Sequence, residues 1–247
     1  MAARIDRQQP GRIGKTEKGE RREEMICVQK FSRPEGIKGK EKYRLEHEAG
    51  LRLLSQALCA RKGLSGLTVE ELEKKIQKKP GGKPYFPEFP KVHFNLSHSE
   101  DVAACALGRA PVGIDVEKLR PFRLSYSGRM LTAGEQAYLE GCSESGRDRE
   151  FFRIWTLKES LAKAMGLGLG LDFRQVEFLL TPWEPETEGK CRILQDEDIR
   201  VRFLHKEGDC QREWHFAQTI WEEEYVVSFC GQERADGILF LPSQILR

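Results

Sequence analysis

The chain has 247 residues, of which 39% are hydrophobic and 32% are charged, and its formal net charge at neutral pH is +2. A chain of this length buries a core without disulfide or metal cross-links, and its apolar content excludes wholesale disorder. Residues 1–24 carry the whole charge excess. The formally neutral remainder therefore lacks the basic field that selects nucleic acid or an anionic membrane.

The seven cysteines are scattered along the chain and form no Cys-x-x-Cys pair. Zinc sites and disulfide frameworks need clustered spacing, so we expect reduced thiols and a cytoplasmic location. Residues 1–24 lack the apolar stretch of a signal peptide, and their acidic residues argue against an organellar targeting sequence. No apolar run approaches the roughly 20 residues of a membrane-spanning helix, so we expect no membrane partner.

The first predicted elements follow a polar N-terminal segment. Residues 1–24 hold almost no large apolar side chains and are predicted to be a disordered tail. Apolar residues at helical spacing predict a helix over 40–61 that ends at Gly63. Thr68 followed by Glu71 is a capping box, which starts a short helix reaching to about residue 78.

The rest of the chain mixes strands and helices without a regular alternation. Three strands are predicted after a Pro-rich connector, over 92–96, 102–107 and 112–117. Thr132 and Glu135 form a second capping box, and a long helix over 148–165 ends at Gly166 and Gly168. Four more strands of one antiparallel sheet are predicted over 175–180, 199–205, 214–220 and 225–230. This order predicts an α+β fold.

Two carboxylates, Asp115 and Glu117, lie two positions apart on a predicted strand and project from the same face. Like charges this close repel unless a cation lies between them, and a hard divalent ion such as Mg²⁺ is the usual solution. The alternative is an ordinary strand end, with two solvated acids that Lys118 and Arg120 neutralise.

Trp155, Glu159 and Lys163 follow one another at i, i+4 spacing and form a stripe on the long helix. Glu159 and Lys163 have the favourable order for a surface ion pair, which contributes about 0.3 kcal/mol. The stripe also lies beside the apolar Phe152 and Ala162, where charge without a partner is expensive to bury. A functional role is the alternative to a plain surface pair.

A third group of residues offers donors to an anionic ligand. Lys83 lies in the rigid segment Gly82-Lys83-Pro84, and Ser97 and His98 lie at the end of a predicted strand. Ser97 and His98 are not a nucleophile–base pair by their spacing, and the chain has no Gly-x-Ser-x-Gly elbow.

Together the motifs form a recognisable order. The succession Gly-Lys-Pro, Asn-x-Ser-His-Ser, Gly-Ile-Asp-Val-Glu, Trp-x-x-Lys-Glu-Ser-x-x-Lys and Gly-x-Gly-Leu resembles the Sfp-type 4′-phosphopantetheinyl transferases. The resemblance covers about residues 40–230. It implies two pseudo-symmetric α+β halves in one chain, with coenzyme A between them. By similarity the halves are 25–110 and 111–235, followed by a C-terminal extension over 236–247.

The resemblance implies roles for single residues. Asp115, Glu117 and Glu159 match the acids that hold Mg²⁺ against the pyrophosphate of coenzyme A. Lys163 matches a lysine that contacts the reacting phosphate, and His98 matches a histidine beside the same pyrophosphate.

Other matched positions concern the nucleotide end of coenzyme A. Lys83 and Ser97 match residues that help to bind this 3′-phosphorylated end, and Glu135 lies where the family often has another acid. The basic residues for the 3′-phosphate have four candidates, namely Lys40, Lys42, Arg44 and Arg52. Residues 1–24 have no counterpart in the family.

The chemistry of these residue types agrees with the resemblance. Phosphoryl transfer asks a protein mainly to position reactants and to neutralise spreading charge. A carrier serine is a weak nucleophile and needs a base, for which we expect Glu159, directly or through a water. Lys163 and His98 would stabilise the leaving 3′,5′-ADP. The expected function is Mg²⁺-dependent transfer of phosphopantetheine from coenzyme A to an apo acyl or peptidyl carrier protein, by a monomeric enzyme.

Two other functions could use the same residues. Clustered carboxylates with a lysine also serve metal-dependent nucleases and phosphohydrolases, although the neutral charge of residues 25–247 argues against a nucleic-acid substrate. A non-catalytic carrier-binding protein is the other, but every charged position of the motifs is present. For an acidic carrier, Arg120, Arg123 and Arg129 are expected to form a docking face, with a solvated loop as the alternative.

Overall fold

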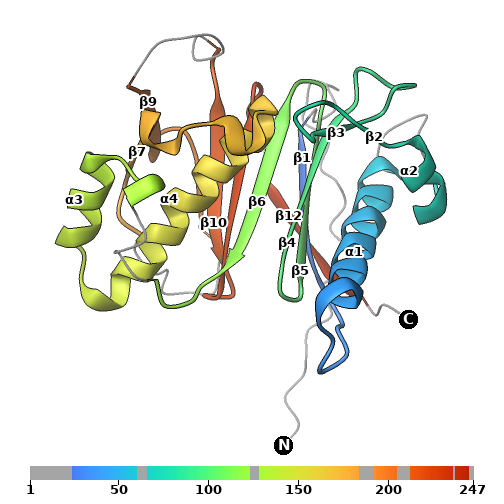
Figure 1. Cartoon of the computed structure of the whole chain (residues 1–247), viewed down its shortest axis with the longest axis horizontal. Coiled ribbons are helices and arrows are strands. Elements are labelled where there is room, and N and C mark those ends of the chain that lie inside the picture. Colours follow the sequence, from blue (N-terminus) through green and yellow to red (C-terminus); the bar gives the residue numbers. More distant parts are fainter. Residues whose placement is uncertain are drawn as a thin grey trace, which may run out of the picture.

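Two four-stranded sheets lie side by side, and a long helix covers the outer side of each (Figure 1). This computed structural model describes residues 24–59, 66–122, 128–183, 192–204, 212–235 and 237–244. The predicted tail up to residue 23, the predicted helix end at Gly63, and Arg123 lie outside the described residues.

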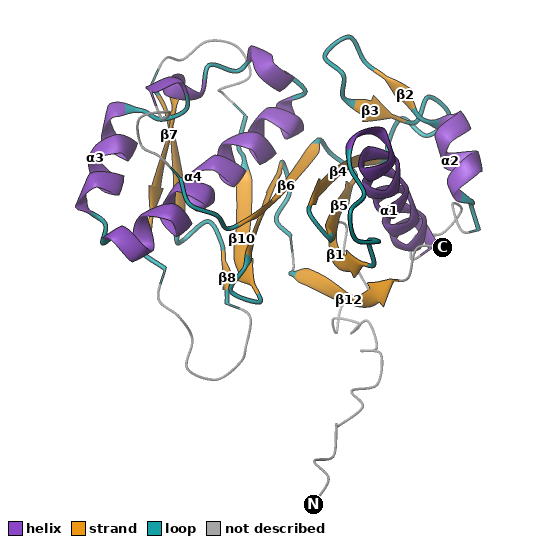
Figure 2. Cartoon of the chain, turned by 60° about the horizontal axis from the view of Figure 1, so that its bottom comes forward, coloured by secondary structure: helices purple, strands orange, loops and turns teal. Residues whose placement is uncertain are grey.

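The first sheet combines strands from both ends of the chain. Its spatial order is β12 (Ile238–Gln244), β1 (Met25–Phe31), β5 (Val102–Gly108) and β4 (His93–Ser99). Helix α1 (Gly39–Cys59) packs on one face of this sheet, and β12 runs along the edge formed by β1 (Figure 2). The buried side of α1 includes all the predicted apolar positions, namely Leu45, Ala49, Leu53, Leu54, Ala57 and Leu58. The prediction of this helix is confirmed.

The second sheet repeats the arrangement. Its spatial order is β6 (Val112–Lys118), β11 (Tyr225–Gly231), β10 (His215–Trp221) and β8 (Ile193–Leu194). Helix α4 (Glu144–Met165) packs on β6 and β11. In each half a strand leads to a long helix and then to an antiparallel hairpin, and the first strand pairs with the last strand of that hairpin. The structure therefore has the predicted α+β fold of two related halves.

The smaller elements confirm the capping predictions and correct one prediction. They are α2 (Val69–Lys75), β2 (Gln77–Lys78), β3 (Pro84–Tyr85), α3 (Ala133–Gly141), β7 (Val176–Leu180), β9 (Ile199–Phe203) and two 3₁₀ turns, Gly168–Gly170 and Phe173–Gln175. Both capping boxes have their two reciprocal hydrogen bonds. The prediction of one antiparallel sheet from the last four strands is wrong. Within the described chain, β7 and β9 pair with each other and pack their apolar sides against the core under α4.

A shared core lies between the two sheets. It contains inward-facing residues of β1, β5, β6 and β11, including Ile26, Val28, Val102, Ala104, Ile114, Val116, Val227 and Phe229. Because every member of that set is nearly inaccessible to solvent, the sheets are held together by apolar burial. Among the described helices, none combines the length and apolar character needed to span a bilayer.

Candidate active site

The seam between the halves is closed by side chains of β4 rather than by backbone pairing. Alternate amides of β6 donate to alternate side chains of β4. The three hydrogen bonds run from Ile114 to Asn95 (2.9 Å), from Val116 to Ser97 (3.2 Å) and from Lys118 to Ser99 (3.0 Å). Since both strands have a two-residue period, these bonds set the register of β6 against β4. In this register Ser97 Oγ donates to Asp115 Oδ1 over 3.0 Å, and Ser99 Oγ lies 3.4 Å from Glu117 Oε2.

Helix α4 approaches β6 closely at Gly113. A Cβ atom on this residue would lie 1.9 Å from the carbonyl oxygen of Ser160 and 2.5 Å from the backbone nitrogen of Ala164. Glycine is therefore required for this approach. The contact brings the helical turn that carries Glu159 and Lys163 against the strand that carries the two acids.

Lys163 joins α4 to β6. Its Nζ lies 2.6 Å from Asp115 Oδ1, and it also donates to Ser97 Oγ and to the carbonyl oxygen of Ile114, each over 3.2 Å. The side chain of Asp115 is only 7% exposed, and its Oδ2 has no hydrogen-bond partner among the described residues. A buried carboxylate oxygen with unused lone pairs is an available ligand for a cation.

The three acids of the motifs act on one another electrostatically. Burial raises the pKa of Glu159, Asp115 raises it further, Lys163 opposes both effects, and Glu117 adds to the rise. Burial also raises the pKa of Asp115, against the lowering effect of Lys163. Asp115, Glu117, Glu159 and Lys163 therefore lie within electrostatic range of one another.

The structure also decides between the alternatives for these motifs. Asp115 is buried, so an ordinary solvated strand end does not describe it. Glu117 fits that description better, because it accepts a hydrogen bond from Arg120 Nη1 over 2.8 Å. In the described part of the chain, Lys163 pairs with Asp115, so it is not simply the surface partner of Glu159.

The donor chemistry of these acids fits a hard divalent cation. Three mutually repelling carboxylates, one of which has a buried oxygen that accepts no hydrogen bond from any described residue, are the type of ligand that Mg²⁺ prefers. Among the described residues, no three His, Cys, Asp or Glu side chains converge closely enough to hold a metal. The ammonium group of Lys163 lies against Asp115 Oδ1 instead.

His98 reaches this neighbourhood from the first half of the chain. Its Nδ1 lies 3.5 Å from Glu46 Oε2. Burial lowers the pKa of His98, Glu46 raises it, and Lys163 lowers it. The charge of Lys163 thus acts on the imidazole, so His98 lies within electrostatic range of this lysine.

Lys83 ties the first half to the second. Its Nζ donates to the carbonyl oxygens of Val112 (3.1 Å) and Ala164 (2.5 Å), at the start of β6 and the end of α4. Burial lowers its pKa to about 8. The adjacent Gly81 lies directly against Gly166, since a Cβ on Gly81 would be 2.4 Å from the Gly166 carbonyl oxygen. The segment around Lys83 therefore packs on the end of the helix that carries Lys163.

The four basic candidates for the 3′-phosphate differ in their surroundings. Arg52 binds Glu48 at 2.6 Å, and Arg44 lies 3.6 Å from the same acid. Both arginines line a cavity beside α1. Lys42 instead lies 3.6 Å from Glu46, and its charge acts on His98. Lys40 is exposed.

Glu135 forms a buried ion pair with Lys158. Its carboxylate lies 2.6 Å from Lys158 Nζ, and the two side chains are 1% and 0% exposed. It also accepts hydrogen bonds from the amides of Thr132 (2.8 Å) and Phe178 (2.9 Å), while Lys158 donates to the carbonyl oxygen of Phe173 over 2.7 Å. This pair connects α3, α4 and β7 immediately beside Glu159.

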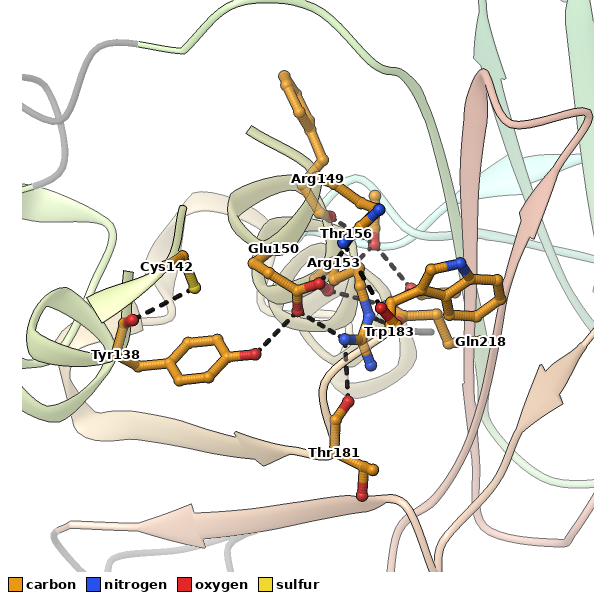
Figure 3. A network of polar contacts seen from close by, with 11 residues as sticks. Tyr138, Cys142, Arg149, Glu150, Arg153, Thr156, Thr181, Trp183 and Gln218 are labelled. Carbon is orange, nitrogen blue, oxygen red and sulfur yellow. Dashed lines mark hydrogen bonds and ion pairs between the residues drawn. The ribbon is translucent and has the colours of Figure 1, made fainter. Parts of the chain in front are cut away.

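A second buried network anchors α4 to the sheet (Figure 3). Arg153, which is fully buried, donates to Glu150 (2.6 Å), Gln218 (2.8 Å) and the carbonyl oxygen of Thr181 (3.0 Å). Tyr138 donates to Glu150 over 2.9 Å. Because a buried hydrogen-bonded network of charged groups restricts local geometry, these contacts position the helix that carries Glu159 and Lys163.

Sequence reasoning missed several of these contributions. Asn95 and Ser99 had a readable signal, because polar residues alternate along a predicted strand and so share one side. Glu46 had none, since a single acid among helical apolar positions does not show whether it is buried. The pairing of Glu135 with Lys158 was equally invisible, because it depends on how α3 packs against α4.

Comparison with known proteins finds similar sequences. Residues 111–230 match the profile of the 4′-phosphopantetheinyl transferase superfamily. A 4′-phosphopantetheinyl transferase of Bacillus subtilis is 38% identical over 160 residues, which are 64% of this chain and 63% of that protein. The 4′-phosphopantetheinyl transferase Sfp of Bacillus subtilis (strain 168) is 30% identical over 129 residues, which are 52% of each protein.

Among solved structures, the holo-[acyl-carrier-protein] synthase of Thermotoga maritima is 24% identical in sequence to this chain, with a TM-score of 0.36. The match covers 49% of this chain and 62% of the synthase chain. This chain thus spans between about half and two thirds of the proteins that it resembles. The fold and the site define an α+β protein of two related halves, with acids and a lysine at their seam. Over residues 111–230 the chain is similar to the 4′-phosphopantetheinyl transferase superfamily.

Proposed function

We propose that this chain is a 4′-phosphopantetheinyl transferase that modifies apo acyl or peptidyl carrier proteins. The serine hydroxyl of the carrier attacks the phosphorus that bears the pantetheine arm of coenzyme A. The new bond joins the serine oxygen to this phosphorus, and the bond to the departing phosphate of 3′,5′-ADP breaks. The serine proton passes to a base, and the products are the holo-carrier and 3′,5′-ADP.

One observation carries the proposal. Lys163 Nζ lies 2.6 Å from Asp115, within the electrostatic neighbourhood of Glu159 and Glu117, and His98 adjoins the same group. These residues come from three of the five motifs that resemble the family. A group of acids near an ammonium group and an imidazole suits the neutralisation of a pyrophosphate once a divalent cation is bound.

Asp115, Glu117 and Glu159 are the residues that would hold Mg²⁺. When bound, the ion would make the phosphorus more electrophilic and stabilise the departing phosphate. The Oδ2 atom of Asp115, which has no hydrogen-bond partner in the described part of the chain, supports this assignment. Magnesium dependence and the identity of the ADP product both belong to the proposal.

The protein's own groups divide the remaining work. Glu159 has a raised pKa, which suits a base that accepts the serine proton directly or through a water. Lys163 and His98 stabilise the negative charge that grows on the departing phosphate. Ser97 holds Asp115 and adjoins Lys163. Lys83 uses two of its three N–H donors on backbone carbonyls, which leaves one for the nucleotide end of coenzyme A.

The carrier protein would approach along the loop that follows β6. Carrier proteins that are acidic would be attracted by Arg120 and Arg129, both of which are exposed. Arg120 is partly committed, since it binds Glu117 and stacks its guanidinium 4.7 Å above the ring of Phe152. We therefore propose Arg129 as the more available charge. The double variant Arg120→Ala/Arg129→Ala should bind the carrier more weakly, and its affinity should change less with salt concentration than that of the wild type. If the salt dependence of the affinity is unchanged, the solvated-loop alternative is favoured.

We also place this activity in the cytoplasm and in a monomer. Free cysteines such as Cys27 and Cys105 are compatible with a reducing compartment. Both halves of the seam come from one chain, so no second copy is needed to complete the site. Sedimentation of the purified protein would test the monomer.

The proposal is tested by incubating the protein with coenzyme A, magnesium chloride and a set of apo acyl and peptidyl carriers. Intact-mass spectrometry should show one phosphopantetheine added to at least one carrier, and 3′,5′-ADP should appear in equal amount. A carrier whose acceptor serine is replaced by alanine should stay unmodified. No mass gain on any carrier would contradict the proposal, and cleavage of coenzyme A without a carrier would favour a phosphohydrolase.

A further inference from the structure

Glu46 is an acid on an otherwise apolar helix face. It lies among the leucines and alanines of α1 that pack on the first sheet, and it is 6% exposed. Burying a carboxylate costs free energy unless partners compensate for the lost water. Helix packing alone does not explain an acid at this position, because leucine or methionine would fill the space without that cost.

The partners of Glu46 point toward the site. Its Oε1 lies 3.6 Å from Lys42 Nζ, and its Oε2 lies 3.5 Å from His98 Nδ1. The imidazole packs edge-on against the ring of Tyr43, with 6.4 Å between ring centroids. The His98 side chain is 34% exposed, so part of the ring remains open to a ligand while Glu46 and Tyr43 hold the rest.

We propose that Glu46 is a positioning residue that holds the imidazole of His98 through Nδ1 and leaves Nε2 for the phosphate of coenzyme A. The inference rests on the proposed transferase function. A carboxylate beside one ring nitrogen selects the tautomer and restrains the orientation of the ring. With a proton on Nδ1 facing Glu46, Nε2 is the nitrogen that takes up the second proton and, once protonated, donates to an anionic oxygen.

Among the described charged groups around His98, Glu46 is the one that favours the protonated form of the imidazole. The groups that face the imidazole come from α1 and α4. Burial lowers the pKa of His98, Glu46 raises it, and Lys163, His47 and Lys42 lower it. Glu46 thus opposes the effects of burial and of the three basic side chains on the pKa of His98. Without its charge, the imidazole would be less often protonated beside a phosphate.

Kinetics provide the first test. Glu46→Gln keeps the shape of the side chain and removes its charge, and Glu41→Gln is the matched control, because Glu41 is an exposed acid in the first turn of the same helix. We expect Glu46→Gln to lower kcat about 10-fold, with KM for coenzyme A changed less than about twofold. In a His98→Ala background, Glu46→Gln should cause no further loss, because it acts through the ring. An unchanged kcat, or an equal loss on top of His98→Ala, would overturn the inference.

The second test does not depend on transfer. Imidazole ¹⁵N chemical shifts of the ligand-free protein report the tautomer and the pKa of His98. The wild type should carry the neutral-form proton on Nδ1, and His98 in Glu46→Gln should titrate at lower pH than in the wild type and in Glu41→Gln. If the His98 pKa and tautomer are the same in all three proteins, the inference fails even where carriers are modified. If the His98 pKa and tautomer change as expected in Glu46→Gln while the wild type modifies no carrier, the pairing of Glu46 with His98 stands. The proposed transferase function then fails.

Discussion

Lys163 Nζ lies 2.6 Å from Asp115 Oδ1, although 48 positions of sequence separate the two residues. The contact exists because Gly113 allows α4 to lie against the backbone of β6. Ser97, from the other half of the chain, binds both partners of this pair. The ion pair therefore joins α4 to β6, and the hydrogen bonds of Ser97 join this pair to β4, the edge strand of the first half.

Asp115→Asn is expected to reduce the proposed transfer at least about 100-fold, because it removes the buried charge that would bind the cation. Glu159→Gln should have a loss of similar size, since it removes both a ligand and the proposed base. Initial rates of carrier modification, followed by intact mass, measure the effect. Circular dichroism should show that both variants remain folded.

Asp172→Asn is the matched control for these two variants. Asp172 pairs with Arg174 on the surface, and its side chain is 41% exposed, so the rate should stay close to that of the wild type. Rates like those of the wild type in both Asp115→Asn and Glu159→Gln would refute the assignment of the metal ligands.

Gly113→Ala is expected to destabilise the protein by about 2–3 kcal/mol, because the added methyl group would overlap the backbone of α4. Urea unfolding measures the free energy of unfolding. Gly141→Ala is the control, since a Cβ on this last residue of α3 meets no atom within 4 Å. Equal stabilities for the two variants would show that the helix and strand are not in close contact.

Lys158→Met should lower the free energy of unfolding by about 3 kcal/mol, since it leaves the buried Glu135 carboxylate without its cation. The exposed cation Lys74, on α2, provides the comparison, and Lys74→Met should change the stability by less than about 0.5 kcal/mol. Thermal and urea unfolding of both variants test the difference. A small effect of Lys158→Met would mean that the pair does not contribute to holding α3 on α4.

Lys83 should make the stability depend on alkaline pH. Burial lowers its pKa from 10.5 to about 8 in the folded protein, so the unfolded chain holds more protons between these values, and stability from this group rises as pH increases through that window. A neutral amine still has two N–H donors for the two carbonyls that Lys83 contacts.

Urea unfolding at about pH 7.5 and about pH 9.5 measures this contribution. The stability of the wild type relative to Lys83→Met should increase with pH, whereas the stability relative to Lys91→Met, which removes an exposed lysine, should stay constant. If the stability of the wild type relative to Lys83→Met decreased as the pH increased, the folded protein would favour the ammonium form of Lys83.

Much of the local structure was predictable because its signals connect residues close in sequence. A capping box needs only Thr68 and Glu71, or Thr132 and Glu135, and both boxes form as predicted. The predicted strands at 102–107 and 112–117 correspond to β5 and β6 within one residue. Strand β1 was not predicted, and neither was the return of β12 to the first sheet, because pairing between strands at opposite ends of a chain leaves no local pattern.

The sequence by itself determined which residue types are available for phosphoryl chemistry, their order along the chain, and the helices and strands that carry them, since propensity, periodicity and capping act over a few residues. Only the tertiary structure decided that Asp115 is buried against Lys163, that β4 side chains close the seam, and that Glu46 faces His98. Those outcomes depend on which surfaces lose water when the two sheets and their helices pack together. Burial and long-range pairing are properties of the folded whole, and no short window of sequence contains them.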